Sequence, residues 1–269
     1  MDKVLVLARG LGTRMRREDP RATLTREQEE VAATGVKALI PIRRPFLEYV
    51  LTAVADAGYR RICLVVGPEH EELRRYYGEA LRYARLQVEF AVQQQPLGTA
   101  NAVAAGEAFA GDGPFLMINS DNYYPVEALE AMRRLEGPGL PLFSRQGMLA
   151  GSNIPAERLL RFAVVEVGAD GYMKRIIEKP SPAQVAALPE PVGVSMNCWR
   201  FDARIFAACR VIPPSPRGEL EITDAVQHAI DRLGVRFRAV PCTAAVLDLS
   251  SRDDVAGVAR LLEGKEVRV

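Results

Sequence analysis

The chain has 269 residues, of which 48% are hydrophobic, and its 35 lysines and arginines against 34 acidic residues leave a formal charge of +1. This balance excludes the broad basic surface of a nucleic-acid-binding protein. Its apolar runs are far shorter than the roughly 20 residues of a membrane-spanning helix, and its first residues lack a signal-peptide pattern. With four scattered cysteines, we expect a cytoplasmic protein with reduced thiols and no membrane partner.

The first predicted element is a buried strand over residues 3–8, an unbroken apolar run of strand length. Gly10 and Gly12 follow it, and they permit a tight turn whose amide N–H groups are free to meet a phosphate. Arg14 adds guanidinium donors that stay charged. Glycine-rich turns are also common in α/β proteins that bind no ligand at the turn. The spacing of these glycines matches neither the dinucleotide-binding fingerprint nor the P-loop.

The polar residues 15–36 form a predicted insertion or lid. Within it, Thr25 and Gln28 have the spacing of a capping box, which predicts a short helix that ends near Gly35. A lid over a ligand and an ordinary surface insertion both fit this composition. Directly after the insertion, Lys37 is a lone lysine next to apolar residues.

Strands and helices alternate over the next part of the chain. The apolar periodicity predicts helices over 45–58, 69–85 and 99–109, and strands over 62–66, 87–92 and 115–118. This alternation predicts a right-handed, mostly parallel sheet with helices on both faces, in one domain over residues 1–269. Ligands of such sheets bind beyond the carboxyl ends of the strands, where the Gly10 loop lies.

Two of these strand ends carry further candidate residues. Gln93 follows the third strand, and its side-chain amide offers a donor and an acceptor that match the edge of uracil or thymine. Plain surface polarity is the alternative for this glutamine. Asp121 follows the fourth strand, where a carboxylate is placed to hold a divalent cation or to cap a turn.

The second half of the chain changes character. Residues 161–167 and 172–177 predict a hairpin, so the later part of the sheet is expected to be mixed. Lys179 lies at the end of this hairpin, because Pro180 ends the strand. The remaining features are a strand over 192–201 with Asn197 and the only tryptophan, Trp199, a helix from 217 to 233, a second aspartate at Asp248 and a last helix over 252–262.

Six motifs in this order resemble the sugar-1-phosphate nucleotidyltransferase family. They are L-A-R-G-L-G-T-R-M, Q-P-L-G-T-A, S-D-N, E-K-P, R-G-E-L-E-I-T-D-A and L-D-L-S-S, with Lys37 between the first two. Each motif is weak alone, but their register is specific and covers nearly the whole chain. The resemblance implies a Rossmann-like, GT-A-like α/β fold with a mixed, mostly parallel sheet. It also implies an Mg²⁺-dependent enzyme that converts an NTP and a sugar 1-phosphate into an NDP-sugar and pyrophosphate.

The resemblance implies roles for individual residues as well. Arg14, Lys37 and Lys179 match the catalytic cations of the family, and Asp121 and Asp248 match the aspartates that hold Mg²⁺. Trp199 is expected to be a core residue rather than a platform for the sugar ring. The positions assigned to the sugar phosphate are Glu178, Lys179 and Asn197, and those assigned to the nucleotide are Ala8, Gly10, Gly12, Thr13, Gln93, Gly98 and Thr99.

Departures from the family pattern leave alternatives open. Arg9 stands where many relatives have alanine or glycine, Val36 replaces a proline, and L-D-L-S-S lacks the glycine that usually follows the aspartate. Gln93 favours UTP or dTTP, whereas guanylyltransferase relatives tend to have an acidic residue there. The alternatives are a GTP-using relative, a CTP-using relative such as a phosphocholine cytidylyltransferase, and a catalytically silent regulatory subunit. A homo-oligomer is compatible with the sequence.

Overall fold

A computed structural model describes residues 1–20, 22–188 and 192–269, so residue 21 of the predicted insertion lies outside the described residues. The strands are β1 (Lys3–Leu7), β2 (Arg61–Val66), β3 (Gln87–Val92), β4 (Phe115–Asn119), β5 (Asn122–Tyr123), β6 (Gly139–Ser144), β7 (Val164–Val167), β8 (Met173–Ile177), β9 (Gly193–Val194), β10 (Trp199–Phe201), β11 (Arg238–Cys242) and β12 (Leu247–Asp248).

The helices alternate with these strands along the chain. They are α1 (Thr13–Arg16), α2 (Arg26–Thr34), the 3₁₀ helix η1 (Lys37–Leu39), α3 (Phe46–Asp56), α4 (Glu71–Arg75), the π-helix η2 (Tyr76–Ala80), α5 (Thr99–Ala105), α6 (Glu107–Ala110), α7 (Val126–Arg134), α8 (Arg145–Gly151), α9 (Ala156–Leu159), α10 (Pro182–Ala186), α11 (Arg204–Val211), α12 (Ile222–Leu233) and α13 (Asp254–Leu261). Across the described ranges, no helix is long and apolar enough to cross a membrane.

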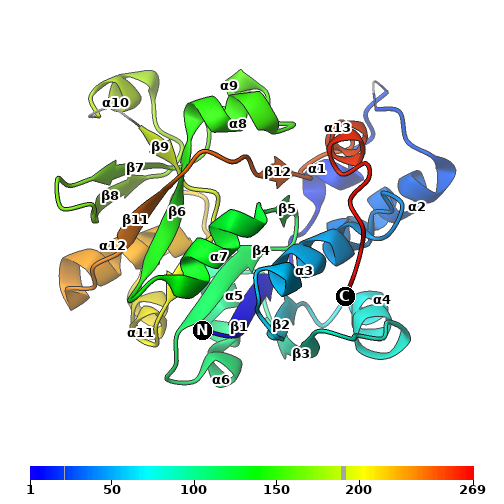
Figure 1. The fold of residues 1–269 in the computed structure, drawn as a ribbon, viewed down its shortest axis with the longest axis horizontal. Coiled ribbons are helices and arrows are strands. Elements are labelled where there is room, and N and C mark those ends of the chain that lie inside the picture. The colour runs from blue at the N-terminus through cyan, green and yellow to red at the C-terminus, as the bar shows by residue number, and fades with distance from the viewer. Residues whose placement is uncertain (21, 189–191) are drawn as a thin grey trace.

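Within the described residues, ten strands form one large sheet (Figure 1). Their order is β3-β2-β1-β4-β10-β6-β9-β7-β8, with β11 beside β6. The neighbours from β3 to β4 are parallel, whereas β10 pairs antiparallel to β4 and the strands from β6 to β8 are antiparallel to one another. The sheet is therefore mixed with a parallel core, as predicted.

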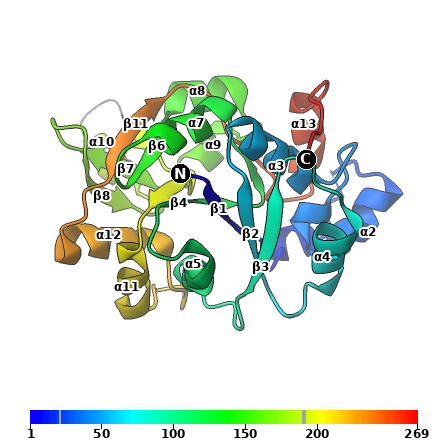
Figure 2. The ribbon, with the colours of Figure 1, turned by 60° about the horizontal axis from the view of Figure 1, so that its bottom comes forward.

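Helices cover both faces of this sheet, and β1 shows why. Val4 and Val6 belong to one buried cluster, together with α3 and α7, while Leu5 and Leu7 belong to another, together with α5, α11 and α12. Because side chains alternate along a strand, one apolar run supplies both clusters. Figure 2 shows these two groups of helices on opposite sides of the sheet.

The structure confirms the predicted patterns whose residues all lie close together in the sequence. The Thr25 side chain accepts from the N–H of Gln28, whose side chain in turn accepts from the N–H of Thr25. Helix α2 ends at Gly35, which has a φ of 77°. The predicted hairpin is also present, because β7 and β8 pair antiparallel.

Three predicted elements are interrupted. The predicted helix over 69–85 is too long, because α4 and η2 end before Leu81, whose N–H donates to the carbonyl of Tyr76. Ala80, at the end of η2, is exposed. The helix over 99–109 divides at Gly106, against which Leu5 packs where a side chain would stand. The strand over 192–201 divides into β9 and β10, because Asn197 turns the backbone with a φ of 52°.

Candidate functional site

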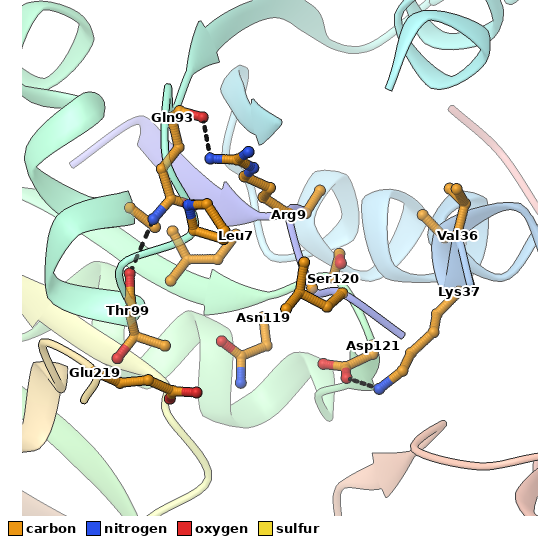
Figure 3. Close-up of a pocket in the computed structure, with 17 residues that line it drawn as sticks. Leu7, Arg9, Val36, Lys37, Gln93, Thr99, Asn119, Ser120, Asp121 and Glu219 are labelled. Carbon is orange, nitrogen blue, oxygen red and sulfur yellow. Dashed lines mark hydrogen bonds and ion pairs between the residues drawn. The ribbon is translucent and has the colours of Figure 1, made fainter. Parts of the chain in front are cut away.

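A cavity of about 250 Å³ lies beyond the carboxyl ends of β1, β3 and β4 (Figure 3). The loops after these strands form most of its wall, because parallel neighbours end at the same edge of the sheet. Its lining residues are Leu7, Ala8, Arg9, Gly10, Leu11, Val36, Lys37, Ala38, Gln93, Pro96, Gly98, Thr99, Ala102, Asn119, Ser120, Asp121 and Glu219.

This lining contains half of the residues predicted from the sequence. The predicted residues that line the cavity are Ala8, Gly10, Lys37, Gln93, Gly98, Thr99 and Asp121. The predicted residues that stand outside its lining are Gly12, Thr13, Arg14, Glu178, Lys179, Asn197 and Asp248. The cavity thus gathers most of the predicted nucleotide positions, while the predicted sugar-phosphate positions lie elsewhere.

The glycine loop is held in shape by the segment that follows it. Gly12 has a φ of 60°, and a Cβ built on it would come within 2.1 Å of the Gly35 carbonyl oxygen. The two glycines therefore permit a backbone contact that no other residue pair would allow. This contact brings the end of α2, and with it Lys37, next to the Gly10 loop.

Arg14 lies on the short helix α1 that starts directly after Gly12. Its side chain is exposed, and no hydrogen bond or ion pair joins it to another described residue. Its guanidinium donors are therefore free for an anion. The described part of the 15–36 segment is bonded to the rest of the protein: Gln28 Nε2 donates to the Pro41 carbonyl at 2.8 Å, and Arg252 donates to that of Met15.

Lys37 and Asp121 form an ion pair at the cavity wall. The lysine Nζ lies 2.8 Å from Asp121 Oδ2, and the two side chains are 13% and 26% exposed. Figure 3 shows this pair at one end of the cavity, with Gln93 and Arg9 at the other. Both groups are half-buried beside an open space, so the cation and the carboxylate are available to exchange partners when a charged ligand enters.

Asp248 is brought next to Asp121 by the small sheet of β5 and β12. Asp248 pairs with Asn122 across this sheet, and the Asn122 side chain donates to Asp248 Oδ1 at 3.0 Å. Asn153 accepts from the Asp248 N–H at 2.9 Å and donates to its carbonyl at 2.8 Å, which fixes the backbone. Burial raises the pKa of Asp248 to about 6, and the nearby charge of Asp121 adds to this.

The two aspartates suit a divalent cation that takes further ligands from a substrate. Asp248 Oδ2 is buried and accepts no hydrogen bond from a described residue. The charge of Asp121 disfavours the ionised form of Asp248, and the charge of Arg158 opposes this effect. The described ranges hold no cluster of three or more potential metal ligands among His, Cys, Asp and Glu. Mg²⁺ fits such a sparse site, because it retains waters and binds phosphate oxygens. The Arg158 guanidinium lies 3.3 Å from the same Asp248 oxygen.

Gln93 is 4% exposed, and its side chain is held by the loop and the helix α5 that follow it. Its Nε2 donates to the Gly98 carbonyl at 3.0 Å and to Asn101 Oδ1 at 2.9 Å. Only a nitrogen donates to a carbonyl oxygen, so the orientation of this amide is fixed. Both amide hydrogens are engaged, and no described residue donates to Oε1, so Gln93 offers a ligand an acceptor rather than the donor and acceptor predicted from the sequence.

The predicted sugar-phosphate residues include two with unusual backbone conformations. Lys179 has a φ of 46° and Asn197 a φ of 52°, and no other described residue except glycine has a positive φ. Such conformations cost about 1 to 3 kcal/mol and are concentrated at functional sites. Partial desolvation raises the pKa of Glu178, and the charge of Glu221 raises it further. Trp199 is fully buried and stacks on Phe201, which confirms its prediction as a core residue.

Sequence reasoning missed several residues of the site. Glu219 and Asn119 line the cavity, and Asn119 stands directly before the predicted S-D-N motif, which is a usable signal. Arg158 comes from α9, far from Asp248 in the sequence, and nothing near it in the chain indicates that contact. Arg9 was singled out as unusual, but its partner Glu69 was not foreseen.

The chain matches the family described as "Nucleotidyl transferase" over residues 3–241. A glucose-1-phosphate thymidylyltransferase of Streptomyces antibioticus is 32% identical over 270 residues, which cover 99% of this chain and 68% of the relative. The low-salt glycan biosynthesis nucleotidyltransferase Agl11 of Haloferax volcanii is 28% identical, covering 85% of this chain and 57% of the relative.

A solved structure of UDP-glucose pyrophosphorylase with UDP-glucose superimposes with a TM-score of 0.74 at 20% identity, covering 99% of this chain and 100% of the other. At this identity the likeness concerns the fold, and it confirms the predicted Rossmann-like nucleotidyltransferase architecture. The family match covers most of the sequence, and the cavity lies where such a sheet binds its ligand. The chain belongs to the nucleotidyl transferase family.

Proposed function

We propose that this nucleotidyltransferase transfers a nucleoside monophosphate from an NTP to a sugar 1-phosphate, giving an NDP-sugar and pyrophosphate. The observation that carries the proposal is the cavity at the strand ends, where the Gly10 loop, Gln93 and the Lys37–Asp121 pair line one space. Relatives named as glucose-1-phosphate thymidylyltransferases support a sugar phosphate as the acceptor.

In this reaction, an oxygen of the sugar phosphate attacks the α-phosphorus of the NTP, and the bond between that phosphorus and the β-phosphate oxygen breaks. The attack brings two anions together, so positioning and charge compensation suffice, without a nucleophilic side chain. Lys37 exchanges the Asp121 carboxylate for a phosphate oxygen of the incoming NTP. Arg14 and Lys179, both exposed cations, approach the phosphates of the two substrates.

Asp121 and Asp248 would hold the Mg²⁺ ion, which supplies charge neutralisation at phosphate oxygens when bound. The exchange of partners by Lys37 frees Asp121 for this role, and Asn122 and Asn153 keep Asp248 beside it. Arg158, whose guanidinium lies 3.3 Å from Asp248 Oδ2, compensates part of the Asp248 charge.

The base is proposed to be thymine or uracil, with dTTP favoured by the thymidylyltransferase relatives. The free Oε1 of Gln93 accepts from an N–H, and thymine and uracil present one at N3. Cytosine presents a lone pair at the same position, so a CTP-using enzyme is disfavoured by this geometry.

The test is release of pyrophosphate in the presence of Mg²⁺, with dTTP, UTP, GTP, CTP and ATP each offered with a panel of sugar 1-phosphates and with phosphocholine. We expect turnover with dTTP or UTP and a hexose 1-phosphate, and its loss when Mg²⁺ is replaced by EDTA. Preference for GTP, or for CTP with phosphocholine, would overturn the proposed substrates. Absence of turnover with every pair would favour a regulatory subunit.

A further inference from the structure

Arg9 occupies an unusual position between the cavity and a carboxylate. It follows β1 directly, lines the cavity, and its side chain is 6% exposed. Its Nε and Nη2 donate to the two oxygens of Glu69 at 3.1 and 3.2 Å, and its Nη1 donates to the backbone carbonyl of Gln93. Figure 3 shows the guanidinium next to Gln93 at one end of the cavity.

These bonds join the carboxyl ends of three neighbouring strands. Arg9 comes after β1, Glu69 after β2 and Gln93 after β3, and these strands lie side by side in the sheet. The strand β3 is at the edge of the sheet, so its end has a strand neighbour on one side, where the Gln93 N–H donates to the Val66 carbonyl. The Arg9 guanidinium supplies the bond to the Gln93 carbonyl.

The consequence concerns the direction of the Gln93 side chain. Its backbone is held by Val66 and Arg9, and its Nε2 is held by Gly98 and Asn101. The side chain therefore has one polar atom left for a ligand, the acceptor Oε1. A smaller residue in place of Arg9 would leave the carbonyl of a buried residue without this charged donor and would release the end of β3.

We propose that Arg9 is a positioning residue for base selection: it fixes the end of β3 so that Gln93 meets the base with Oε1 alone. The inference rests on the proposed function, because it takes the base of an NTP to lie against Gln93. Uracil and cytosine differ at N3, where one has an N–H and the other a lone pair. A rigid acceptor at that point discriminates between them. If the backbone of Gln93 shifts relative to Gly98 and Asn101, the bonds that hold its NH₂ group are lost, and an amide that is free to turn does not discriminate.

The test compares UTP with CTP in wild type, Arg9→Ala and Arg9→Lys. We expect Arg9→Ala to raise the KM for UTP with a small change in kcat, and to reduce the UTP/CTP ratio of kcat/KM about tenfold or more. Lysine keeps the charge but does not reach both partners with a fixed fork, so Arg9→Lys should rescue the ratio in part. Arg61→Ala is the matched control, because it removes an Arg–Glu pair of similar length outside the cavity.

A double-mutant cycle separates positioning from a merely structural effect. If Arg9 acts through Gln93, the Arg9→Ala/Gln93→Ala variant loses no more discrimination than Gln93→Ala alone. Additive losses, or an Arg9→Ala enzyme as selective as wild type, would overturn the inference. Glu69→Gln, which keeps the side-chain size and weakens the hold on Arg9, gives a milder version of the same loss should Arg9→Ala fold poorly.

The two proposals fail in distinguishable ways. Selectivity is also measured as binding of UTP and CTP by calorimetry without any sugar phosphate. One outcome is that wild type binds UTP selectively, Arg9→Ala loses that selectivity, and wild type turns over no sugar 1-phosphate. This outcome contradicts the proposed function and supports the role of Arg9. Wild type that turns over sugar 1-phosphates, with unaltered base selectivity after Arg9→Ala, supports the proposed function and contradicts the role of Arg9.

Discussion

Asp121 and Asp248 are the residues whose removal should affect catalysis without affecting folding. Each contributes one negative charge beside the cavity, and the amide of asparagine has nearly the same shape without that charge. We expect Asp121→Asn and Asp248→Asn each to lower kcat on the order of 10²- to 10³-fold, the cost of losing a charged partner in a preorganised site. Pyrophosphate release measures the rate, and circular dichroism during heating checks the fold.

A matched control for these two variants is Asp202→Asn. Asp202 is paired with Arg204 outside the cavity lining, so its loss should leave kcat within about twofold. Full activity in Asp121→Asn or in Asp248→Asn would remove that aspartate from the proposed site for Mg²⁺.

His70 should make the stability of the protein depend on pH. Burial lowers its pKa, and its Nδ1 accepts the N–H of Gly67 at 3.3 Å, which requires the neutral ring. The unfolded chain then binds more protons than the folded one at pH values between the lowered pKa of the folded state and the ordinary histidine pKa of about 6.5. The contribution of His70 to the free energy of unfolding is therefore complete above about pH 6.5. It is lost as the pH falls through the lower pKa of the folded state.

Urea unfolding at a series of pH values between 5 and 8 measures this contribution. The variant His70→Asn keeps an acceptor near Gly67 but does not titrate, so its stability should fall less at acidic pH than that of wild type. His228→Asn changes the other histidine of the chain and serves as the control. Parallel curves for wild type and His70→Asn would contradict the assignment to His70.

At the scale of elements, the contact between Gly12 and Gly35 couples the first loop to the segment that carries Lys37. Alanine at Gly12 would place its Cβ 2.1 Å from the Gly35 carbonyl oxygen, which accepts the Lys37 N–H at 3.0 Å. We expect Gly12→Ala to destabilise the fold by about 3 kcal/mol or more and to raise the KM for the NTP, because Lys37 moves away from the Gly10 loop.

The matched control is Gly234→Ala. Gly234 has nearly the same φ, 63°, but a Cβ there meets no atom within 4 Å. Gly234→Ala should lower the free energy of unfolding by about 1 to 2 kcal/mol, which is the strain of the left-handed conformation alone, and should leave KM unchanged. Equal losses of stability in the two variants, measured by urea unfolding, would show that the contact between the glycines contributes nothing.

The elements also show which parts of the fold the sequence could predict. Helix α2 was predicted with its cap and its end, because Thr25, Gln28 and Gly35 fix it through bonds within the helix itself. The prediction of one strand over 192–201 was wrong. The sequence is largely apolar on both sides of Asn197, but the backbone turns at that residue. Periodicity reports which residues are buried, and it does not report where a buried segment bends.

At the scale of the whole molecule, the general position of the site was predictable and its bonds were not. Parallel strands end at one edge of the sheet, so Gly10, Gln93 and Asp121 were expected to lie together, and all three line the cavity. The pairs Arg9–Glu69 and Arg158–Asp248 join segments far apart in the sequence. No local pattern encodes such pairs, because they depend on how the loops after different strands approach each other.

The single domain predicted from the sequence leads to a prediction about ligand-linked stability. The two buried clusters share β1 and the strands beside it, so the fold should unfold in one transition. With Mg²⁺, dTTP at 100 times its dissociation constant should add about 2.7 kcal/mol, because it binds the folded state alone. For a chain of this size that corresponds to a rise in Tm of about 5 to 10 °C. Calorimetric scans of wild type and Lys37→Met measure it; Lys37→Met should lose most of the rise, whereas two separate transitions in wild type would contradict a single domain.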